Sequence, residues 1–527
     1  MTYIVPNNGS VGIIGGGISG LSYAFFLSKF RPDIKIRIFE SSKRSGGWIN
    51  TEFLKINGKD VGFEKGPRTL GGINDGTLLI IDILKQLGKE EQIEYLGRKS
   101  PGNRKYLLNN SDEIMEIHSF KALQYFLNSG LMRAFLKSII MEPFQKKRID
   151  IEDESIEHFV SRRLNKSLSD NLLSALIHGI YAGDVANLSV RSIFPRLPIW
   201  EEKYGSIIIG MVKQIGKKNK NLSQTLIDYQ NNISPQSNMD GLSNDFKRRG
   251  VFKLRDGLEV LPQALSHYLM NQDNVEIEYN SNIKSISCRD LKIQTSNATY
   301  KYDHIHSTIN WNIFQNLIHP SNRKTSIKID YVSILLISVY TKRIIIPKEQ
   351  SGFGFLVPKS NKNDNCLLGV IYDSDVENNA QAIYSSAPKS EKPFTKLTLM
   401  MGGHFYRNKN KISESFILQS AKKVMRDILK INANDNEFIF RNGLKDESKI
   451  LNVNAKDILL SYNFLSECIP QYNVGHEKQK QEVHRLLTQE YSNNITLGGM
   501  CFGSGPGVPD CIQNSLRNAL LCSSCQN

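Results

Sequence analysis

One stretch near the N-terminus, residues 11–48, constrains the fold of this chain more than any other. A short apolar run leads into three glycines with the spacing G-x-G-x-x-G, which are Gly15, Gly17 and Gly20. A helical pattern follows, and alternating apolar residues then predict a second strand that ends at Glu40. The order strand, tight turn, helix, strand is typical of a βαβ unit that binds a dinucleotide.

The three glycines and the acid each have a physical reason to be there. Gly15 permits the sharp turn, Gly17 lets backbone approach a pyrophosphate, and Gly20 lets the helix pack on the strand. The N-terminus of the helix directs N–H groups at phosphate, and Glu40 is placed to accept ribose hydroxyls. The predicted contacts in the turn are Gly15, Gly16, Gly17, Ile18, Ser19 and Gly20. The alternative is a glycine-rich turn that binds nothing.

The residues directly after Glu40 indicate which dinucleotide is bound. Arg44 is followed by Gly46, Gly47 and Trp48. An acid followed by R-x-G-G is a common second fingerprint of FAD oxidoreductases, so the sequence favours FAD over NAD. We predict cofactor contacts from Glu40, Arg44, Gly47 and Trp48.

A second glycine turn follows a predicted hairpin. Asn57-Gly58 lies between two alternating runs, which is a strong hairpin signal. The motif G-P-R-T comes next, and its turn can bring backbone and one cation to the cofactor. We therefore add Gly66, Pro67, Arg68 and Thr69 to the predicted cofactor contacts.

Composition limits the classes of partner. The 527 residues suffice for two or three domains, and the net charge of +15 favours anionic partners such as acidic lipid headgroups or an acidic substrate. No zinc finger, RNP motif or basic block points to nucleic acid. Seven scattered cysteines argue against a disulfide framework, and we predict no metal site. We also expect no transmembrane helix and no cleavable signal peptide.

Residues 110–204 have a helical character. The expected helices are Phe120 to Phe126, Met132 to Ile140, Ile156 to Leu164 and Asn171 to His178. One side of the first pair is apolar, and lysines such as Lys137, Lys146 and Lys147 flank it. This pattern is typical of helices that lie in a membrane interface, but it also fits a core-facing pair with solvated lysines.

The remaining chain predicts an α/β protein with a discontinuous nucleotide domain. We expect a polar loop over residues 219–249, an antiparallel sheet for a substrate within residues 326–470, and a final strand and helix that return to the cofactor. The predicted domains are a Rossmann-like FAD-binding domain (8–97, 251–312 and 491–527), an α+β substrate domain (98–109, 205–250 and 313–490) and a helical insert (110–204). Further predicted cofactor contacts are Ile283, Met500, Pro506, Gly507 and Val508.

Five motifs, in the same order along the chain, resemble the oxygen-dependent protoporphyrinogen oxidases of the amine oxidase and phytoene desaturase superfamily, in their eukaryotic mitochondrial form. These motifs are residues 63–69, residues 179–184, residues 188–192, residues 352–358 and residues 507–512. The resemblance implies an FAD enzyme that oxidises protoporphyrinogen IX to protoporphyrin IX, the penultimate step of haem synthesis. Six electrons leave in three rounds, and three O2 become three H2O2. The flavin carries the chemistry, so no catalytic side chain is nominated.

The resemblance also implies substrate contacts. Gly179 corresponds to a glycine that faces the macrocycle, Leu356 and Ile371 to an apolar pair on one side of the ring, and Met400 to the residue on the other. An arginine often anchors a propionate in this family. Here the matching residue is Lys105, with Arg104 beside it, so which of the two contacts substrate stays open.

The same resemblance makes residues 110–204 a membrane-binding domain, expected on the mitochondrial inner membrane facing the intermembrane space. A homodimer is one candidate for the oligomeric state, which the sequence does not determine. Two alternative functions stay open. One is another FAD enzyme of the superfamily, an amine oxidase or a carotenoid desaturase, and the other is a non-catalytic flavoprotein.

Overall fold

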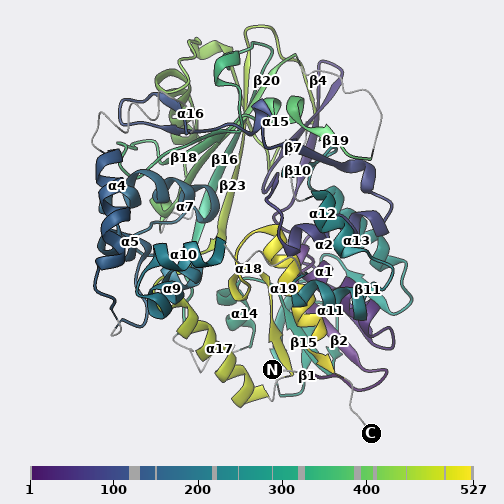
Figure 1. Ribbon diagram of the computed structural model, residues 1–527. Helices are drawn as coiled ribbons and strands as arrows, with labels where there is room; N and C mark the ends of the chain where they lie inside the picture. The colour runs from purple at the N-terminus through teal and green to yellow at the C-terminus, as the bar shows by residue number, and fades with distance from the viewer. Residues whose placement is uncertain are drawn as a thin grey trace.

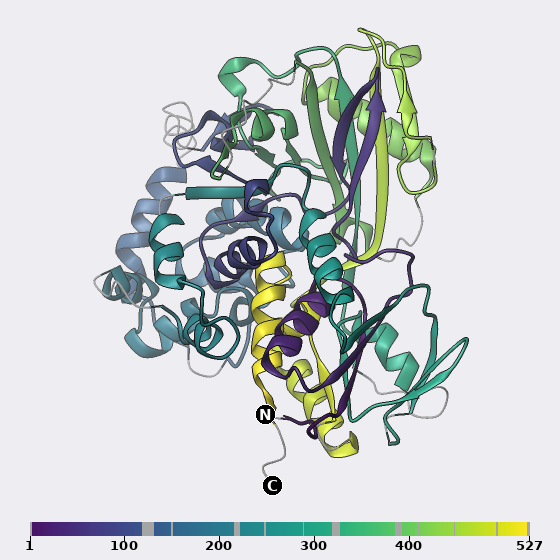
Figure 2. The ribbon, with the colours of Figure 1, turned by 90° about the vertical axis from the view of Figure 1, so that its right-hand side faces the viewer.

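The computed structural model describes residues 3–117, 131–148, 151–215, 222–246, 249–287, 289–318, 327–384, 393–407, 412–446, 448–491 and 494–523. Figure 1 shows a nucleotide-binding part at the lower right, a large sheet above it, and a group of helices at the left. Figure 2, turned by 90°, shows the large sheet rising above the nucleotide-binding part, with the yellow C-terminal helix packed inside the lower part.

A parallel sheet of five strands organises the nucleotide-binding part. Its order is β11-β3-β2-β15-β24, and every pairing in it is parallel. The strands are β2 (Ser10–Ile14), β3 (Lys35–Phe39), β11 (Val275–Glu278), β15 (His304–Ser307) and β24 (Ile495–Leu497). Segments that are hundreds of residues apart in sequence therefore share one sheet, which confirms that the later strands return to the first.

Helices and a small sheet cover the two faces of the parallel sheet. One face packs against α1 (Ile18–Phe30), α2 (Asp75–Gln86), α13 (Val260–Met270) and α19 (Val508–Leu520). The other packs against α14 (Trp311–Ile318), α17 (His476–Tyr491) and the sheet of β12 (Ile283–Ser287), β13 (Lys292–Thr295) and β14 (Thr299–Lys301). Burial on both faces explains why these strands are mostly continuous apolar runs.

The prediction of a polar loop over residues 219–249 is wrong. This segment contains α11 (Gln224–Asn232) and α12 (Met239–Phe246). Both helices bury short apolar sides, including Leu226, Tyr229 and Phe246, in the same core as α1 and α2. The few apolar residues that pack these helices into the core lie among many polar ones, so the composition of the segment wrongly predicted a loop.

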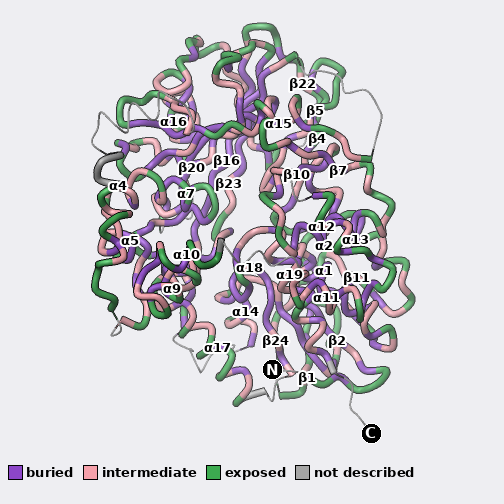
Figure 3. The backbone as a smooth tube through the Cα atoms, in the orientation of Figure 1, coloured by how far each residue is buried: buried purple, intermediate pink, exposed green. Residues whose placement is uncertain are grey.

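The large sheet has eight strands in the order β21-β23-β16-β20-β18-β17-β8-β9. They are β8 (Lys105–Leu108), β9 (Ile114–Glu116), β16 (Tyr331–Thr341), β17 (Gly354–Leu356), β18 (Leu367–Ile371), β20 (Thr395–Gly403), β21 (Phe438–Asn442) and β23 (Ile458–Pro470). The pairings of β21 with β23 and of β17 with β8 are parallel, so the sheet is mixed rather than antiparallel throughout. Helix α16 (Glu414–Asp427) covers one face, and Figure 3 shows the central strands mostly buried.

Smaller elements connect these parts. Strands β4 (Thr51–Ile56) and β5 (Lys59–Glu64) form the predicted hairpin, with Asn57 at φ 49° and Gly58 at φ 81°. The remaining strands are β1 (Tyr3–Ile4), β6 (Leu70–Gly71), β7 (Ile93–Gly97), β10 (Arg249–Leu254), β19 (Gln381–Ala382), β22 (Ile450–Leu451) and β25 (Cys522–Ser523). Short helical turns are η1 (Glu90–Gln92), η2 (Pro101–Asn103), α15 (Asp373–Asn379), η5 (Lys348–Gln350), η6 (His404–Tyr406), η7 (Asp435–Glu437) and α18 (Gly499–Phe502).

The third part is the group of helices at the left of Figure 1. It comprises α4 (Leu131–Met141), η3 (Glu142–Phe144), α5 (Ile156–Arg163), α6 (Lys166–Leu168), η4 (Ser169–Leu173), α7 (Ser174–Tyr181), α8 (Val190–Ile193), α9 (Arg196–Tyr204) and α10 (Ile207–Ile215). The predicted helices over 132–140 and 156–164 are confirmed, and the one over 120–126 lies outside the described residues. Within the described ranges, no helix is both long and apolar enough to cross a membrane.

Candidate functional site

The two glycine fingerprints of the sequence touch each other. Gly17 and Gly46 form an isolated parallel bridge, and the Gly46 N–H donates to the Gly16 carbonyl at 2.9 Å. A Cβ on Gly47, whose φ is 59°, would come within 3.2 Å of the Gly17 Cα. The βα turn and the R-x-G-G loop are therefore two sides of one site.

The βα turn has the shape of a phosphate cradle. Gly15 has φ 101°, and a Cβ on Gly20 would lie 1.9 Å from the Gly15 carbonyl oxygen, so only glycine fits at position 20. Beside Gly17 there is space, since a Cβ there would meet only the Gly47 Cα, at 3.8 Å. Gly17 is the N-cap of α1 and brings no side chain to cap it. The open end of α1 thus fits a pyrophosphate.

Glu40 lies beside this cradle, at the end of β3. Its side chain is buried, and its two carboxylate oxygens accept the N–H groups of Gly16 and Ser42, each at 2.8 Å. The Glu40 carbonyl accepts the Ser281 N–H at 2.9 Å, which brings the start of β12, with Ile283, to the same edge. A buried carboxylate held by backbone N–H groups at this edge fits recognition of a ribose.

Arg44 supports the loop that carries Gly47 and Trp48. Its guanidinium donates to the carbonyls of Ser45 and Ile49, each at 2.9 Å, and of Gly47 at 2.7 Å. It thereby fixes the loop that faces Gly17. A contact between Arg44 and a cofactor phosphate stays a prediction.

The G-P-R-T turn joins the cofactor loop to the large sheet. A Cβ on Gly66 would lie 2.0 Å from the Trp48 carbonyl oxygen, so this turn packs directly on the R-x-G-G loop. Arg68 is buried, and its Nη1 lies 3.0 Å from Asp373 Oδ1. Asp373 Oδ2 accepts the Thr398 hydroxyl at 2.7 Å. Asp373 was not predictable from the sequence, because 305 positions separate it from Arg68.

The carboxylate at position 64, just before this turn, is also in an unusual environment. Glu64 accepts the Leu258 N–H at 2.7 Å and the Thr51 hydroxyl at 2.8 Å. Burial raises the pKa of Glu64 to about 7, against the opposing effect of these hydrogen bonds.

The C-terminal segment lies near the cradle because it follows β24, another strand of the same parallel sheet. Helix α19 begins at its N-cap Gly507 and packs along α1, where the Ser515 hydroxyl donates to the Ser19 carbonyl at 2.9 Å. Because α1 follows β2 and the α18–α19 segment follows β24, both start at the carboxyl edge of one parallel sheet. The predicted contacts Met500, Pro506, Gly507 and Val508 all lie in this segment.

Two residues that sequence reasoning missed support the C-terminal turn. The Tyr472 hydroxyl donates to the Met500 carbonyl, and His476 Nε2 lies 3.2 Å from the Cys501 carbonyl oxygen. The two rings stack with centroids 4.4 Å apart. Burial lowers the pKa of His476 to about 4, so the ring is neutral near pH 7. Nothing local in the sequence relates these side chains to a turn 25 or more residues later.

Three of the predicted substrate residues share one face of the large sheet. Leu356 pairs with Gly369, which pairs in turn with Met400, so their side chains point the same way. Ile371 is two residues beyond Gly369 and joins them. All three are partly exposed, whereas alternate residues of the same strands are buried in the core beneath α16. Ile371 also pairs with Thr398, the residue that joins this face to Arg68 through Asp373.

Gly179 lies against this face from the helical part. A Cβ at position 179 of α7 would come 3.1 Å from Leu356 Cδ2. Lys105 pairs with Gly354 of the same sheet, and both Arg104 and Lys105 are exposed. The structure therefore brings Gly179, Leu356, Ile371 and Met400 together, with the two cations at the start of β8, the strand next to β17 in the same sheet.

The helical part exposes an apolar patch that spans α4, η3 and α10. These elements contact one another. We call the following exposed residues the apolar patch: Leu136, Ile140, Met141, Phe144, Ile209, Met211 and Val212. Phe144 is 78% exposed and Ile140 is 67% exposed, values unusual for such residues in water.

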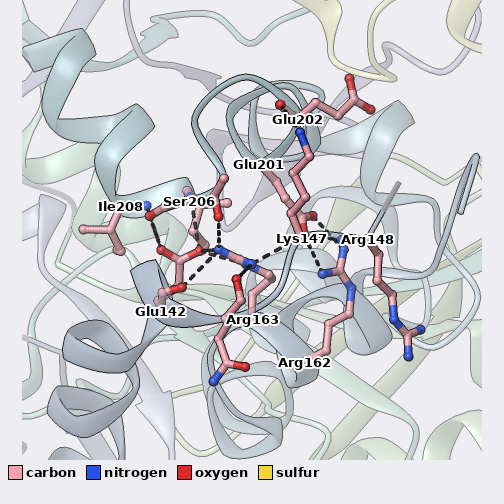
Figure 4. A network of polar contacts seen from close by, with 12 residues as sticks. Glu142, Lys147, Arg148, Arg162, Arg163, Glu201, Glu202, Ser206 and Ile208 are labelled. Carbon is pink, nitrogen blue, oxygen red and sulfur yellow. Dashed lines mark hydrogen bonds and ion pairs between the residues drawn. The ribbon is translucent and has the colours of Figure 1, made fainter. Parts of the chain in front are cut away.

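Beneath the patch the helices are joined by charges (Figure 4). Glu142 and Arg163 form a fully buried ion pair, and the Glu142 carboxylate also accepts the N–H groups of Ile207 and Ile208 at 3.0 and 3.2 Å. Arg162 makes a two-bond pair with Glu201, both bonds at 2.7 Å. The helical part thus holds a buried ion pair beside its apolar core, and it also exposes the apolar patch.

The comparisons with known proteins agree with this geometry. Residues 18–498 match the family model described as flavin containing amine oxidoreductase. The chain is 33% identical to protoporphyrinogen oxidase of Saccharomyces cerevisiae, covering 97% of each chain, and 28% identical to that of Schizosaccharomyces pombe, covering 98% and 99%. The human protoporphyrinogen oxidase is 26% identical, with 97% and 98% covered.

Solved structures show the same fold. A structure from Exiguobacterium, described provisionally as a protoporphyrinogen oxidase, matches with a TM-score of 0.68 at 18% identity, covering 98% of each chain. UDP-galactopyranose mutase matches with a TM-score of 0.61 at 12% identity, covering 97% of this chain and 92% of the other. The chain belongs to the flavin-containing amine oxidoreductase family and, within it, to the protoporphyrinogen oxidases.

Proposed function

We propose that this protein is an FAD-dependent oxidase that converts protoporphyrinogen IX to protoporphyrin IX, the penultimate step of haem synthesis. The relatives named above support the reaction. The observation that carries the proposal is the direct connection between the cofactor cradle and an apolar sheet face, through Arg68, Asp373 and Thr398. A large flat substrate needs such a face next to its oxidant.

The chemistry divides between cofactor and protein. When bound, FAD supplies hydride acceptance and reaction with O2. Protoporphyrinogen loses six electrons and six protons over three rounds, and three O2 are reduced to three H2O2. The chain's own residues bind and orient, since no side chain need act as a base.

We assign the cofactor to the two glycine loops and the C-terminal turn. The pyrophosphate would lie at the open end of α1, with Glu40 toward the ribose, and the flavin would extend toward the G-P-R-T turn and the start of α19. The proposed contacts are Gly15, Gly16, Gly17, Ile18, Ser19, Gly20, Glu40, Arg44, Gly47, Trp48, Gly66, Pro67, Arg68, Thr69, Ile283, Met500, Pro506, Gly507 and Val508. The fit rests on the space beside Gly17 and the uncapped helix.

The macrocycle would have Leu356 and Ile371 on one side and Met400 on the other, with Gly179 beside Leu356. Arg104 or Lys105 would pair with a propionate. Apolar contact on the face of the ring and cations at its rim suit a substrate that is flat, apolar and acidic at its edge.

The apolar patch supports a membrane-bound enzyme. We propose that the patch lies in the interface of the mitochondrial inner membrane, facing the intermembrane space, with the net charge of +15 favouring anionic lipid. The three-domain division of the sequence analysis and a homodimer stay proposals of the same kind.

Porphyrin fluorescence tests the reaction. Purified protein given protoporphyrinogen in air should produce protoporphyrin faster than autoxidation, while amines and carotenoid precursors are left unchanged. Oxidation of amines without growth of porphyrin fluorescence would replace this function with the amine oxidase alternative. A protein that binds flavin but oxidises none of these would be a non-catalytic flavoprotein.

A further inference from the structure

Helix α7 determines one wall of the proposed macrocycle site. Gly179 lies tightly against Leu356, since an added Cβ would come 3.1 Å from Leu356 Cδ2 and would require that side chain to shift. The position of this wall therefore depends on what holds α7 against β17.

One contact that holds α7 against β17 comes from the residue directly before Gly179, in addition to the hydrogen bond from the Lys359 N–H to the Ser174 hydroxyl at 2.9 Å. His178 is buried, its Nδ1 lies 2.7 Å from the Val357 carbonyl oxygen, and its Nε2 lies 3.1 Å from His404 Nε2. A carbonyl only accepts, so His178 Nδ1 carries the hydrogen. In the neutral ring, His178 Nε2 is then the acceptor, and His404 donates from its own Nε2.

His404 ties the same helix to a third element. It follows Gly403, which has φ 59° and ends β20, the strand that carries Met400. The His404 N–H donates at 2.8 Å to the carbonyl of Ala182, the left-handed residue that caps α7. The histidine pair thus connects the segments that carry Gly179, Leu356 and Met400.

We propose that His178 and His404 are positioning residues for substrate, and that their neutral hydrogen-bonded pair holds the Gly179 wall against Leu356. Protonation of His178 at Nε2 would place a hydrogen on both Nε2 atoms, and the pair would repel, whereas protonation of His404 at Nδ1 would leave its Nε2–H donating. The inference rests on the proposed function, because that function makes Gly179 a substrate wall. It assigns no proton transfer to either ring.

Acid should release this contact. Burial lowers the pKa of both rings, that of His404 to about 4, with a further lowering of His404 by His178. The pKa of such a histidine is lower in the folded protein than in the unfolded chain, where it is about 6.5. Its contribution to the free energy of unfolding is therefore complete above about pH 6.5 and is lost as the pH falls through the folded pKa. The charged groups that face the pair are Asp184, Lys359 and Arg407. Asp184 opposes the lowering, and the two cations reinforce it.

Steady-state kinetics of three variants test the assignment. His404→Leu removes the donor, and its KM for protoporphyrinogen should rise about tenfold with kcat and flavin content unchanged. His404→Gln keeps an N–H donor, so its KM should stay at the wild-type value. His267→Leu, at an exposed position of α13, is the control and should leave KM unchanged. A wild-type KM in His404→Leu would overturn the proposal.

Hydrogen exchange tests the same contact without activity. In the wild type, amides of residues 174–182 should exchange faster at about pH 4.5 than at about pH 7, after correction for intrinsic exchange rates. This increase should be absent in His404→Gln, because the glutamine carboxamide can rotate and accept a hydrogen from a protonated His178 through its carbonyl oxygen. An equal increase in both proteins would overturn the proposal. If the protein does not oxidise protoporphyrinogen, the proposed function fails, and this experiment still decides whether the pair holds α7.

Discussion

At the scale of single residues, Gly20 and Gly17 of the phosphate cradle are glycine for two different reasons. At position 20 the reason lies in the fold, because a Cβ would overlap the Gly15 carbonyl. At position 17 the folded chain leaves room, and the only neighbour of a Cβ is the Gly47 Cα at 3.8 Å. We therefore expect the reason for glycine at position 17 to be the proposed cofactor rather than the fold.

Alanine at these two positions should give opposite results. Gly17→Ala should leave the melting temperature of the flavin-free protein within about 2 °C of wild type and weaken FAD binding about tenfold or more. Gly20→Ala should lower the melting temperature of the flavin-free protein by at least about 4 °C, because overpacking costs stability. Thermal scans and flavin titrations of the stripped proteins measure both. Unchanged FAD affinity in Gly17→Ala would place the pyrophosphate elsewhere.

Residues of the site were predictable where the signal was local. Gly15, Gly20 and Glu40 follow from spacing within one βαβ unit, and the structure places them as that spacing requires. Asp373 and His404 were not predictable, because their partners lie 305 and 226 positions away. Their roles exist only once β17, β18 and β20 lie side by side.

At the scale of elements, the helical part depends on Glu142. This one carboxylate caps the start of α10 and pairs with Arg163 of α5, so it joins three elements. Both side chains of the pair are fully buried. Removing one partner of such a pair leaves the other charge without compensation.

Arg163→Met should therefore destabilise the protein strongly, by about 3–5 kcal/mol. Arg191→Met is the matched control, since the Arg191–Glu202 pair has side chains 38% and 51% exposed and should lose at most about 1 kcal/mol. Denaturant unfolding of both variants gives the comparison. Equal losses would show that the buried pair contributes no more than a surface pair.

Element prediction succeeded where periodicity was strong and failed where polar residues outnumbered the apolar ones. The hairpin at Asn57-Gly58 and the helices α4 and α5 lie close to where the pattern puts them. Helices α11 and α12 were not predicted, because their apolar residues are sparse. The significance of these residues becomes clear only in the structure, where they pack into the same core as α2. The two parallel pairings of the large sheet depend on topology, which strand patterns do not encode.

At the scale of the whole molecule, the proposed sites would place the substrate between the cofactor and the apolar patch. Helix α7 contributes Gly179 to the substrate wall, and the same group of helices carries the apolar patch. A membrane-dissolved substrate could then enter beside the helices that hold the enzyme on the lipid.

Charge on the patch should release the protein from membranes. The double variant Ile140→Glu, Phe144→Glu should reduce flotation with phosphatidylcholine vesicles containing anionic lipid about tenfold or more. Ile344→Glu is the control, because Ile344 is 71% exposed but lies outside the helical part. Equal flotation of the double variant and the control would place the membrane surface elsewhere.

Anaerobic reduction of the bound flavin tests the central claim most directly. The purified, flavin-loaded protein should lose its yellow absorbance when protoporphyrinogen is added without O2. It should regain that absorbance in air, forming one H2O2 per flavin reoxidised and three per protoporphyrin. A flavin that stays oxidised under protoporphyrinogen, in a protein whose FAD is fully bound, would contradict the account.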